Sequence, residues 1–296
     1  MSDRLTLPTY GGQAVIEGVM MRGARSVAIA MRSPSKEIVL HREPLGKIYQ
    51  GNLKKIPFLR GLVLLWDALG LGMRALTLSA NTQTGEDDKL EGPVLYLTMG
   101  IAFAIGIGLF LLAPAAVGQL AERYLGIGPW WGNLLEGVVR LLLLVGYVWI
   151  IGFMPDIERV FAYHGAEHKT INAFEAGVEL TPENVARFTT EHPRCGTAFL
   201  LTLVLLSVLL FSLLGPLPWL WRLASRILLL PVLAGLAYEY IRWTASHIHL
   251  PWVRFIVRPN LALQHLTTRE PSLDMLEVSI AAFQAMREGE SQEFVE

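Results

Sequence analysis

Two stretches of this 296-residue chain are apolar, carry no charged residue and are long enough to cross a lipid bilayer. They run from 94 to 117 and from 197 to 214. A helix that crosses a bilayer needs about 20 residues, and only a helix or a closed barrel satisfies its backbone polar groups there. These stretches therefore predict a helical membrane protein.

Two further apolar stretches extend the prediction to a bundle of four spans within 93–243. The stretch 134–153 carries Glu136 and Arg140, which are four residues apart and are expected to form an intrahelical ion pair. The stretch 227–238 is short unless the helix begins near Trp219. We expect this bundle to contain a cytoplasmic loop, 155–196, between its second and third spans.

The stretch 58–78 has a different pattern, because charged residues recur on an otherwise apolar helix. Arg60, Asp67 and Arg74 are seven residues apart and share one helix face. This pattern favours an amphipathic or re-entrant helix at the membrane interface over a full span, with a loop completing the unit 58–92.

Composition agrees with a membrane protein and excludes several other classes. Charged residues make up 17% of the chain, against about 25% in ordinary soluble domains. The net charge of −1 gives no basic surface for nucleic acid, so no nucleic-acid partner is expected. Cys195 is the single cysteine, which excludes an intrachain disulfide.

The distribution of Lys and Arg predicts the orientation. Twelve precede the first span, one lies in the connection 119–132, four lie in the loop 155–196 and five follow residue 240. Basic residues concentrate on the cytoplasmic side of membrane proteins. Both termini and the loop 155–196 are therefore expected in the cytoplasm.

The segments outside the bundle predict a small N-terminal β region and a C-terminal tail. Short β-leaning runs at 14–21, 26–32 and 37–41 form a β-rich segment within 1–57. The tail 244–296 ends in an amphipathic helix with Ser272 as N-cap and an apolar stripe of Leu273, Leu276, Ile280 and Phe283. The predicted fold is a mainly α, polytopic helical membrane protein with these two cytoplasmic additions.

The loop 155–196 contains the motif most indicative of chemistry. It includes His164, Glu167 and His168 in the order H-x-x-E-H, within a stretch of helical periodicity from 157 to 175. Two imidazoles at positions i and i+4 of a helix can bind one zinc ion, and the glutamate of this inverted motif acts as general base toward a metal-bound water. The motif predicts a zinc site.

Several residues could supply the third protein ligand that a zinc site needs. The sequence leaves Glu175, His192, Cys195 and Glu239 open as candidates. Other polar residues that could line the same site are Glu17, Arg22, Lys169, Arg194 and Glu270. Each of these side chains alone would suit a solvated or ion-paired surface position, but their concentration between two membrane spans favours a site.

Five strings together resemble the YqhQ-like family of bacterial membrane proteins: GGQAVIEGVMMRG at 11–23, HGAEHKTINAFE at 164–175, HPRCGT at 192–197, AGLAYEYIRW at 234–243 and LTTREP at 266–271. The resemblance covers nearly the whole chain. It implies a multi-span protein of the bacterial plasma (inner) membrane and a suspected metal-dependent enzyme with no assigned substrate. That metal role carries over to His164, Glu167, His168, His192, Cys195, Glu239 and Glu270.

Three functions follow as hypotheses. The first is a zinc-dependent hydrolase or peptidase that acts on a membrane-bound peptide or a lipid-linked substrate. The second is a non-enzymatic assembly or quality-control factor whose His, Glu and Cys cluster is a structural metal site or polar clamp. The third is a small transporter that works as a homo-oligomer, although four or five spans are few and no inverted repeat is visible.

Overall fold

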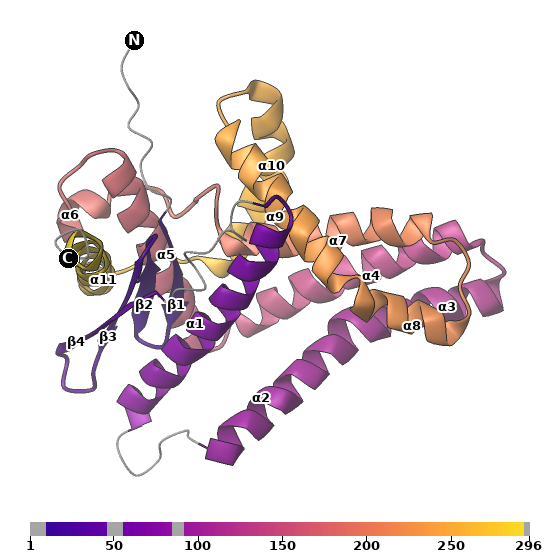
Figure 1. Ribbon diagram of the computed structural model, residues 1–296, viewed down its shortest axis with the longest axis horizontal. Coiled ribbons are helices and arrows are strands. Elements are labelled where there is room, and N and C mark those ends of the chain that lie inside the picture. The colour runs from indigo at the N-terminus through magenta and orange to yellow at the C-terminus, as the bar shows by residue number, and fades with distance from the viewer. Residues whose placement is uncertain (1–9, 46–55, 85–91, 293–296) are drawn as a thin grey trace.

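The computed structural model describes residues 10–45, 56–84 and 92–292. The fold is mainly helical and includes one four-stranded antiparallel sheet. Figure 1 shows the sheet with α5, α6 and α11 at one end of the molecule, and the long apolar helices extending away from it. The predicted class, a helical membrane protein with a small N-terminal sheet, is confirmed at this level.

The apolar helices are long enough to cross a membrane. Within the described residues four qualify by length and composition, and there are five if a bent pair is counted as one span. These helices are α1 (Leu59–Thr84), the continuous run of α2 (Gly92–Ile107), a π-helical turn (Gly108–Leu112) and α3 (Ala113–Leu125), then α4 (Pro129–Ile151), α7 (Gly196–Leu213), and the bent pair α8 (Trp219–Leu228) and α9 (Leu230–Ser246).

Three expected boundaries differ from the structure. The first span is longer than 94–117, because helical structure continues from Gly92 to Leu125. The fourth begins at Trp219, the alternative start considered above, and is a helix pair bent by 43° instead of one continuous helix. The expected interfacial helix at 58–78 extends to Thr84 and passes the same length and composition test as the other spans; residues 85–91 lie outside the described part.

The sheet forms from consecutive antiparallel strands in the order β1–β2–β3–β4. The strands are β1 (Gly11–Val15), β2 (Gly18–Arg22), β3 (Ser26–Arg32) and β4 (Ile38–Pro44). The single strand expected at 14–21 is wrong, because Ile16 and Glu17 form a tight turn between β1 and β2. Glu17 takes a positive φ of 54° there, a conformation that few side chains other than glycine adopt easily.

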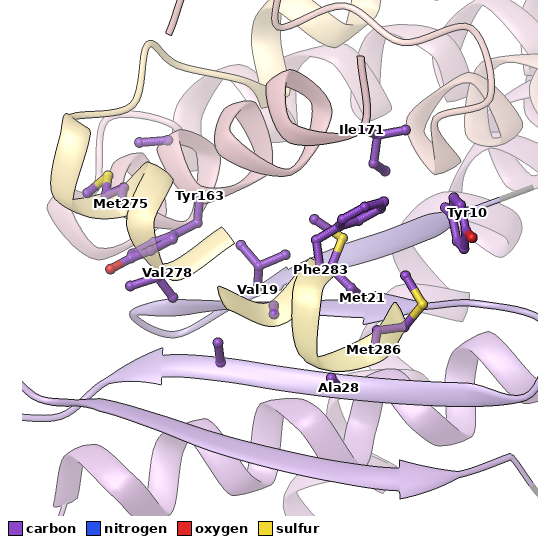
Figure 2. Packing of buried hydrophobic residues seen from close by; sticks show 13 residues of the cluster. Tyr10, Val19, Met21, Ala28, Tyr163, Ile171, Met275, Val278, Phe283 and Met286 are labelled. Atoms are coloured by element: carbon purple, nitrogen blue, oxygen red, sulfur yellow. The ribbon is translucent and has the colours of Figure 1, made fainter. Parts of the chain in front are cut away.

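Each face of the sheet is covered by helices. Alternate residues of β2 and β3 point to opposite sides, as strand geometry requires. Val19, Met21 and Ala28 pack against α5 (Pro155–Glu175) and α11 (Leu273–Gln292), a core shown in Figure 2. Met20, Val27, Ile29 and Met31 on the other side pack against Ala75 of α1. The N-terminal sheet and the C-terminal helix α11 therefore share one hydrophobic core.

Polar contacts hold α1 between the sheet and the helical bundle. Arg60 forms a two-point ion pair with Glu239 of α9, and Arg74 pairs with Glu43 of β4 at 2.9 Å. Ser79 Oγ accepts a hydrogen bond from the backbone N–H of Ile16 in the β1–β2 turn. Two of the charged residues predicted on one face of this helix, Arg60 and Arg74, thus attach it to the bundle and to the sheet.

The C-terminal tail contains two helices where the sequence predicted one. The helix α10 (Pro251–Thr267) was not anticipated, and it contains Pro259. The helix α11 agrees with the prediction: Leu276, Ile280 and Phe283 are buried, whereas Leu273 at the helix start is 50% exposed. The short helix α6 (Pro182–Val185) lies in the loop between α5 and α7.

Candidate metal centre

The helix α5 supplies two of the three side chains at the centre of the candidate site. It begins four residues after α4 ends, with Pro155 at its first position, where the missing N–H costs no hydrogen bond. His164 and His168 are one turn apart on this helix, and their ring centroids are 4.4 Å apart. The predicted pairing of the two imidazoles on one face is therefore present in the structure.

Cys195 supplies the third side chain from the other end of the loop. It is the N-cap residue of α7, and its sulfur accepts a hydrogen bond from the backbone N–H of Thr197. Cys195 Sγ lies 3.3 Å from His164 Nε2. One ligand atom from each of His164, His168 and Cys195 lies within 4.8 Å of the other two. Among the described residues, no other set of three His, Cys, Asp or Glu side chains lies at this spacing.

Backbone carbonyls orient both imidazoles. His164 Nδ1 lies 2.8 Å from the carbonyl oxygen of Thr267, and His168 Nδ1 lies 2.5 Å from that of Thr190. A carbonyl only accepts, so each Nδ1 carries a proton, and in the neutral form of the imidazole Nε2 then keeps its lone pair. This is the arrangement that fixes the tautomer of metal-binding histidines.

Glu167 lies on the adjoining face of α5, beneath strand β1. It is buried, and its Oε2 has no hydrogen-bond partner among the described residues. Burial raises its pKa to about 7, while nearby His164 and a hydrogen bond from the backbone of Gly12 act to lower it. A Cβ at Gly12 would lie 2.9 Å from Glu167 Cδ and 2.6 Å from the carbonyl oxygen of Met20. The strand approaches Glu167 this closely because residue 12 is glycine.

Comparison with known proteins places the chain in a family. Residues 56–289 match the family described as "Protein of unknown function (DUF1385)". The chain belongs to this family. It is also 33% identical over 298 residues to "Uncharacterized protein YqhQ" of Bacillus subtilis (strain 168), an alignment covering 96% of this chain and 93% of that protein. No solved structure matches.

In this DUF1385 chain, two of the alternative ligands form a separate group beside the three central side chains. Glu175 pairs with Arg194, and Glu175 Oε2 lies 3.9 Å from His192 Nε2. The His192 ring lies 5.6 Å from that of His168, centroid to centroid. Burial acts to raise the pKa of Glu175, but hydrogen bonds from His192 and Arg194 outweigh it and hold the pKa below its usual value.

The remaining alternative ligand, Glu239, is held by other groups. Its carboxylate accepts hydrogen bonds from Arg60 and from the backbone N–H of Phe58. These contacts hold it at the α1–α9 contact, and it is not a member of the three-residue group.

The other polar residues predicted around the site also bind elsewhere. Lys169 is buried and pairs with Glu270 at 2.7 Å, which ties α5 to the segment before α11. Glu17 pairs with Arg159 at the start of α5 and also accepts from the Tyr163 hydroxyl. Arg22 lies at the end of β2, opposite Gly11.

Sequence reasoning missed the residues that position the site. The backbone of His192 exchanges two hydrogen bonds of 2.9 Å with the buried side chain of Gln264, which fixes the path of the chain toward Cys195. Gly165 permits another close approach, because a Cβ there would lie 2.2 Å from the carbonyl oxygen of Arg269. The string LTTREP, which contains Thr267 and Arg269, was the signal for this support.

We expect Gly165→Ala to disturb the site, because its methyl group would collide with backbone that cannot rotate away. Displacing residue 269 also displaces the Thr267 carbonyl that holds His164. The expected loss is about 1–3 kcal/mol of unfolding free energy, measured by thermal unfolding in detergent. Gly196→Ala is the matched control, because a Cβ beside Cys195 would meet nothing within 4 Å. Equal stability of the two variants would contradict the close packing at Gly165.

Proposed function

We propose that this chain is a membrane-associated, metal-dependent hydrolase-like protein whose zinc ligands are His164, His168 and Cys195. The observation that carries the proposal is their convergence, with both Nδ1 atoms engaged by carbonyls and with His164 Nε2 lying 3.3 Å from Cys195 Sγ. Zinc accepts imidazole nitrogen and thiolate sulfur, and catalytic zinc sites use three protein ligands and leave a fourth position open.

The proposed role of Glu167 is to take the proton of a water molecule at that fourth position. When bound, zinc supplies Lewis acidity and lowers the pKa of such a water to about 7. A general base works best when its own pKa lies near the working pH, and burial gives Glu167 a pKa of about 7. Its unpartnered, buried Oε2 is a carboxylate oxygen that no described side chain satisfies.

The position of the cluster supports a substrate that is itself bound to the membrane. The helix that carries both histidines begins where α4 ends, and Cys195 caps the first turn of α7. Through Cys195 the cluster therefore lies at the N-terminal end of the apolar helix α7. We propose a membrane-bound peptide or a lipid-linked molecule as substrate, and a location on the cytoplasmic side of the bacterial plasma membrane with both chain termini on that side.

Metal content of the detergent-purified protein tests the site. We expect about one zinc per chain in the wild type and almost none in the His164→Ala/His168→Ala double variant, measured by mass spectrometry of the metal. His247→Ala, at the end of α9, is the control and should keep its zinc. Glu167→Gln should also keep it, because Glu167 is not a ligand. A metal-free wild type after resupply with zinc and washing would overturn the proposal.

A second candidate function is a structural clamp, and one observation favours it. The hydrogen bonds from His164 to Thr267, from His168 to Thr190 and from Gln264 to His192 already join α5, the 189–195 segment and α10. A metal there could serve only to hold these segments for a protein partner. In that case His192, whose ring centroid lies 5.6 Å from that of His168, is the candidate fourth ligand.

Cobalt substitution separates the two functions without a known substrate. If the fourth position is open, adding acetohydroxamate to the Co²⁺-loaded protein should change its visible absorption bands. A closed structural site should not respond, and its removal by a chelator should mainly lower the unfolding temperature. An unresponsive spectrum in both the wild type and His192→Ala would count against the hydrolase proposal.

A further inference from the structure

A second group of charged side chains lies buried among the apolar helices. Glu136 of α4 accepts hydrogen bonds from Arg140 of the same helix at 2.7 Å and from Arg226 of α8 at 2.5 and 2.8 Å. Arg222 of α8 reaches it at 3.3 Å. All four side chains are at most 5% exposed. The ion pair expected between Glu136 and Arg140 is therefore one part of a larger network.

The charges in this network do not balance. Besides Glu136, the network contains one further carboxylate, Glu122 of α3, which pairs with Arg222 at 2.7 Å. Three guanidinium groups and two carboxylates leave one positive charge in excess. Among the described residues, the other groups that accept hydrogen bonds from these arginines are neutral: Asn133, Gln119, Ser207, Ser225 and the carbonyl of Phe110. Arg222 Nε is buried and has no partner in the described residues.

The fold positions these arginines with unusual backbone and ring contacts. Arg140 Nε donates to the carbonyl of Phe110, which lies in the π-helical turn between α2 and α3. Such turns free backbone groups from the helix ladder and are frequent at functional sites. The Phe211 ring lies 4.1 Å from the Arg226 guanidinium carbon. An unbalanced cation held this firmly in an apolar bundle is costly unless a ligand neutralises it.

An apolar pocket opens beside α8. It has a volume of about 270 Å³ and is lined by Leu214, Leu217, Trp221, Ser225, Leu228 and Leu229. Ser225 is its one polar lining residue, and Ser225 Oγ accepts a hydrogen bond from Arg226 at 3.1 Å. The pocket and the arginine network therefore meet at Ser225.

We propose that α8 forms a binding site for a phospholipid with one net negative charge, whose phosphodiester lies at Arg222 and Arg226 and whose acyl chain enters the apolar pocket. One phosphodiester supplies the single negative charge that the network lacks. Arg222 Nε, which has no partner among the described residues, is the donor left for a phosphate oxygen, and a hydrogen bond from a guanidinium to a phosphate is charge-assisted. The exposed Trp219, Leu220 and Trp221 on α8 give the ligand an apolar approach. This site is independent of the proposed metal centre.

The test is lipid binding to the delipidated full-length protein in detergent, followed by native mass spectrometry and thermal unfolding. Dioleoyl phosphatidylglycerol should bind once per chain and at least tenfold more tightly than dioleoyl phosphatidylcholine. Arg222→Gln should reduce phosphatidylglycerol affinity at least tenfold. Arg123→Gln, which removes an exposed arginine at the end of α3, should leave it unchanged.

One variant keeps the test decisive even if Arg222→Gln folds poorly. Glu122→Gln raises the excess charge from one to two and should strengthen phosphatidylglycerol binding several-fold, whereas general damage to the fold would weaken it. Equal affinity for the two lipids, or an equal loss of phosphatidylglycerol affinity in Arg222→Gln and Arg123→Gln, would overturn the proposal.

Leu217→Trp, which fills the pocket, should weaken lipid binding. Inorganic phosphate is the alternative ligand. If it raises the unfolding temperature as much as phosphatidylglycerol does, and if Leu217→Trp does not change that effect, free phosphate is the ligand and the lipid assignment is wrong.

Discussion

Replacing Glu136 with glutamine is expected to destabilise the helical bundle by about 3–5 kcal/mol, the cost typical of removing one partner from a buried ion pair. Glu136 is 1% exposed and accepts hydrogen bonds from three arginines. Glutamine has nearly the same shape but no charge, so three buried guanidinium groups would share Glu122 alone. Detergent-based unfolding, by heat or denaturant, measures the loss.

The matched control is Glu179→Gln, which makes the same chemical change at an exposed position in the loop after α5. Surface substitutions of this kind usually change stability by no more than about 0.5 kcal/mol. A double variant in which Glu136 and Arg140 are both replaced by leucine should recover part of the loss, since it leaves fewer unpaired charges. If Glu136→Gln and Glu179→Gln unfold alike, the buried network is not a major source of stability.

The sequence predicted this network only in part, for a reason connected with the membrane. Glu136 and Arg140 lie four residues apart on one helix, so their pairing follows from helix geometry alone. Arg222 and Arg226 lie near the start of the fourth apolar stretch if that stretch begins at Trp219, and no pairing was predicted for them. In the structure α8 buries its arginines and exposes Trp219, Leu220 and Trp221, the reverse of a helix on a soluble domain. The local sequence pattern does not predict which helix their guanidinium groups contact.

The candidate metal site divides in the same way between local and long-range information. His164 and His168 share a helix face by their spacing, which fixes their relation before any tertiary contact forms. The third metal ligand stayed open among four residues, because its identity depends on the path that the chain takes after α5. The side chain of Gln264 binds the backbone of His192 and so fixes this path, and Cys195 then caps α7 beside His164. These contacts join residues 72 and 31 positions apart.

The N-terminal sheet contains a turn that sequence patterns do not predict. The runs at 26–32 and 37–41 correspond to β3 and most of β4. The hairpin between β1 and β2 was missed because Ile16 and Glu17 lack the Asn-Gly or Asp-Gly pattern typical of two-residue turns. Glu17 adopts its positive φ while its carboxylate is held by Arg159 of α5. A tertiary ion pair here accompanies a turn that its own residues do not favour.

The stability of the metal-free protein is expected to fall as the pH rises from 5 to 8, through the carboxyl group of Glu167. Its pKa is about 7 in the folded chain, raised by burial from 4.5. Between these values the folded state holds a proton that the unfolded state has released, so raising the pH favours unfolding. The shift corresponds to about 3 kcal/mol, fully expressed above pH 7.

The variant Glu167→Gln isolates this contribution from other groups that titrate in the same range. Burial lowers the pKa of His192, so that residue acts in the opposite direction and increases stability as the pH rises through its unfolded value of 6.5. The wild type and Glu167→Gln should therefore be compared at each pH after treatment with a chelator. We expect similar stability at pH 5 and a more stable variant, by up to about 3 kcal/mol, at pH 8. Glu179→Gln should follow the wild type throughout.

The same measurement with zinc present connects this titration to the proposed chemistry. A bound divalent cation is often the largest charge in a site and favours the ionised form of a nearby carboxyl group. Zinc should therefore reduce the pH-dependent difference in unfolding free energy between the wild type and Glu167→Gln, because the ion would then stabilise the wild-type carboxylate above pH 5. Parallel curves for the two metal-free proteins would show that Glu167 titrates normally. An unchanged difference after zinc binding would place the ion too far from Glu167 for this residue to act on its water.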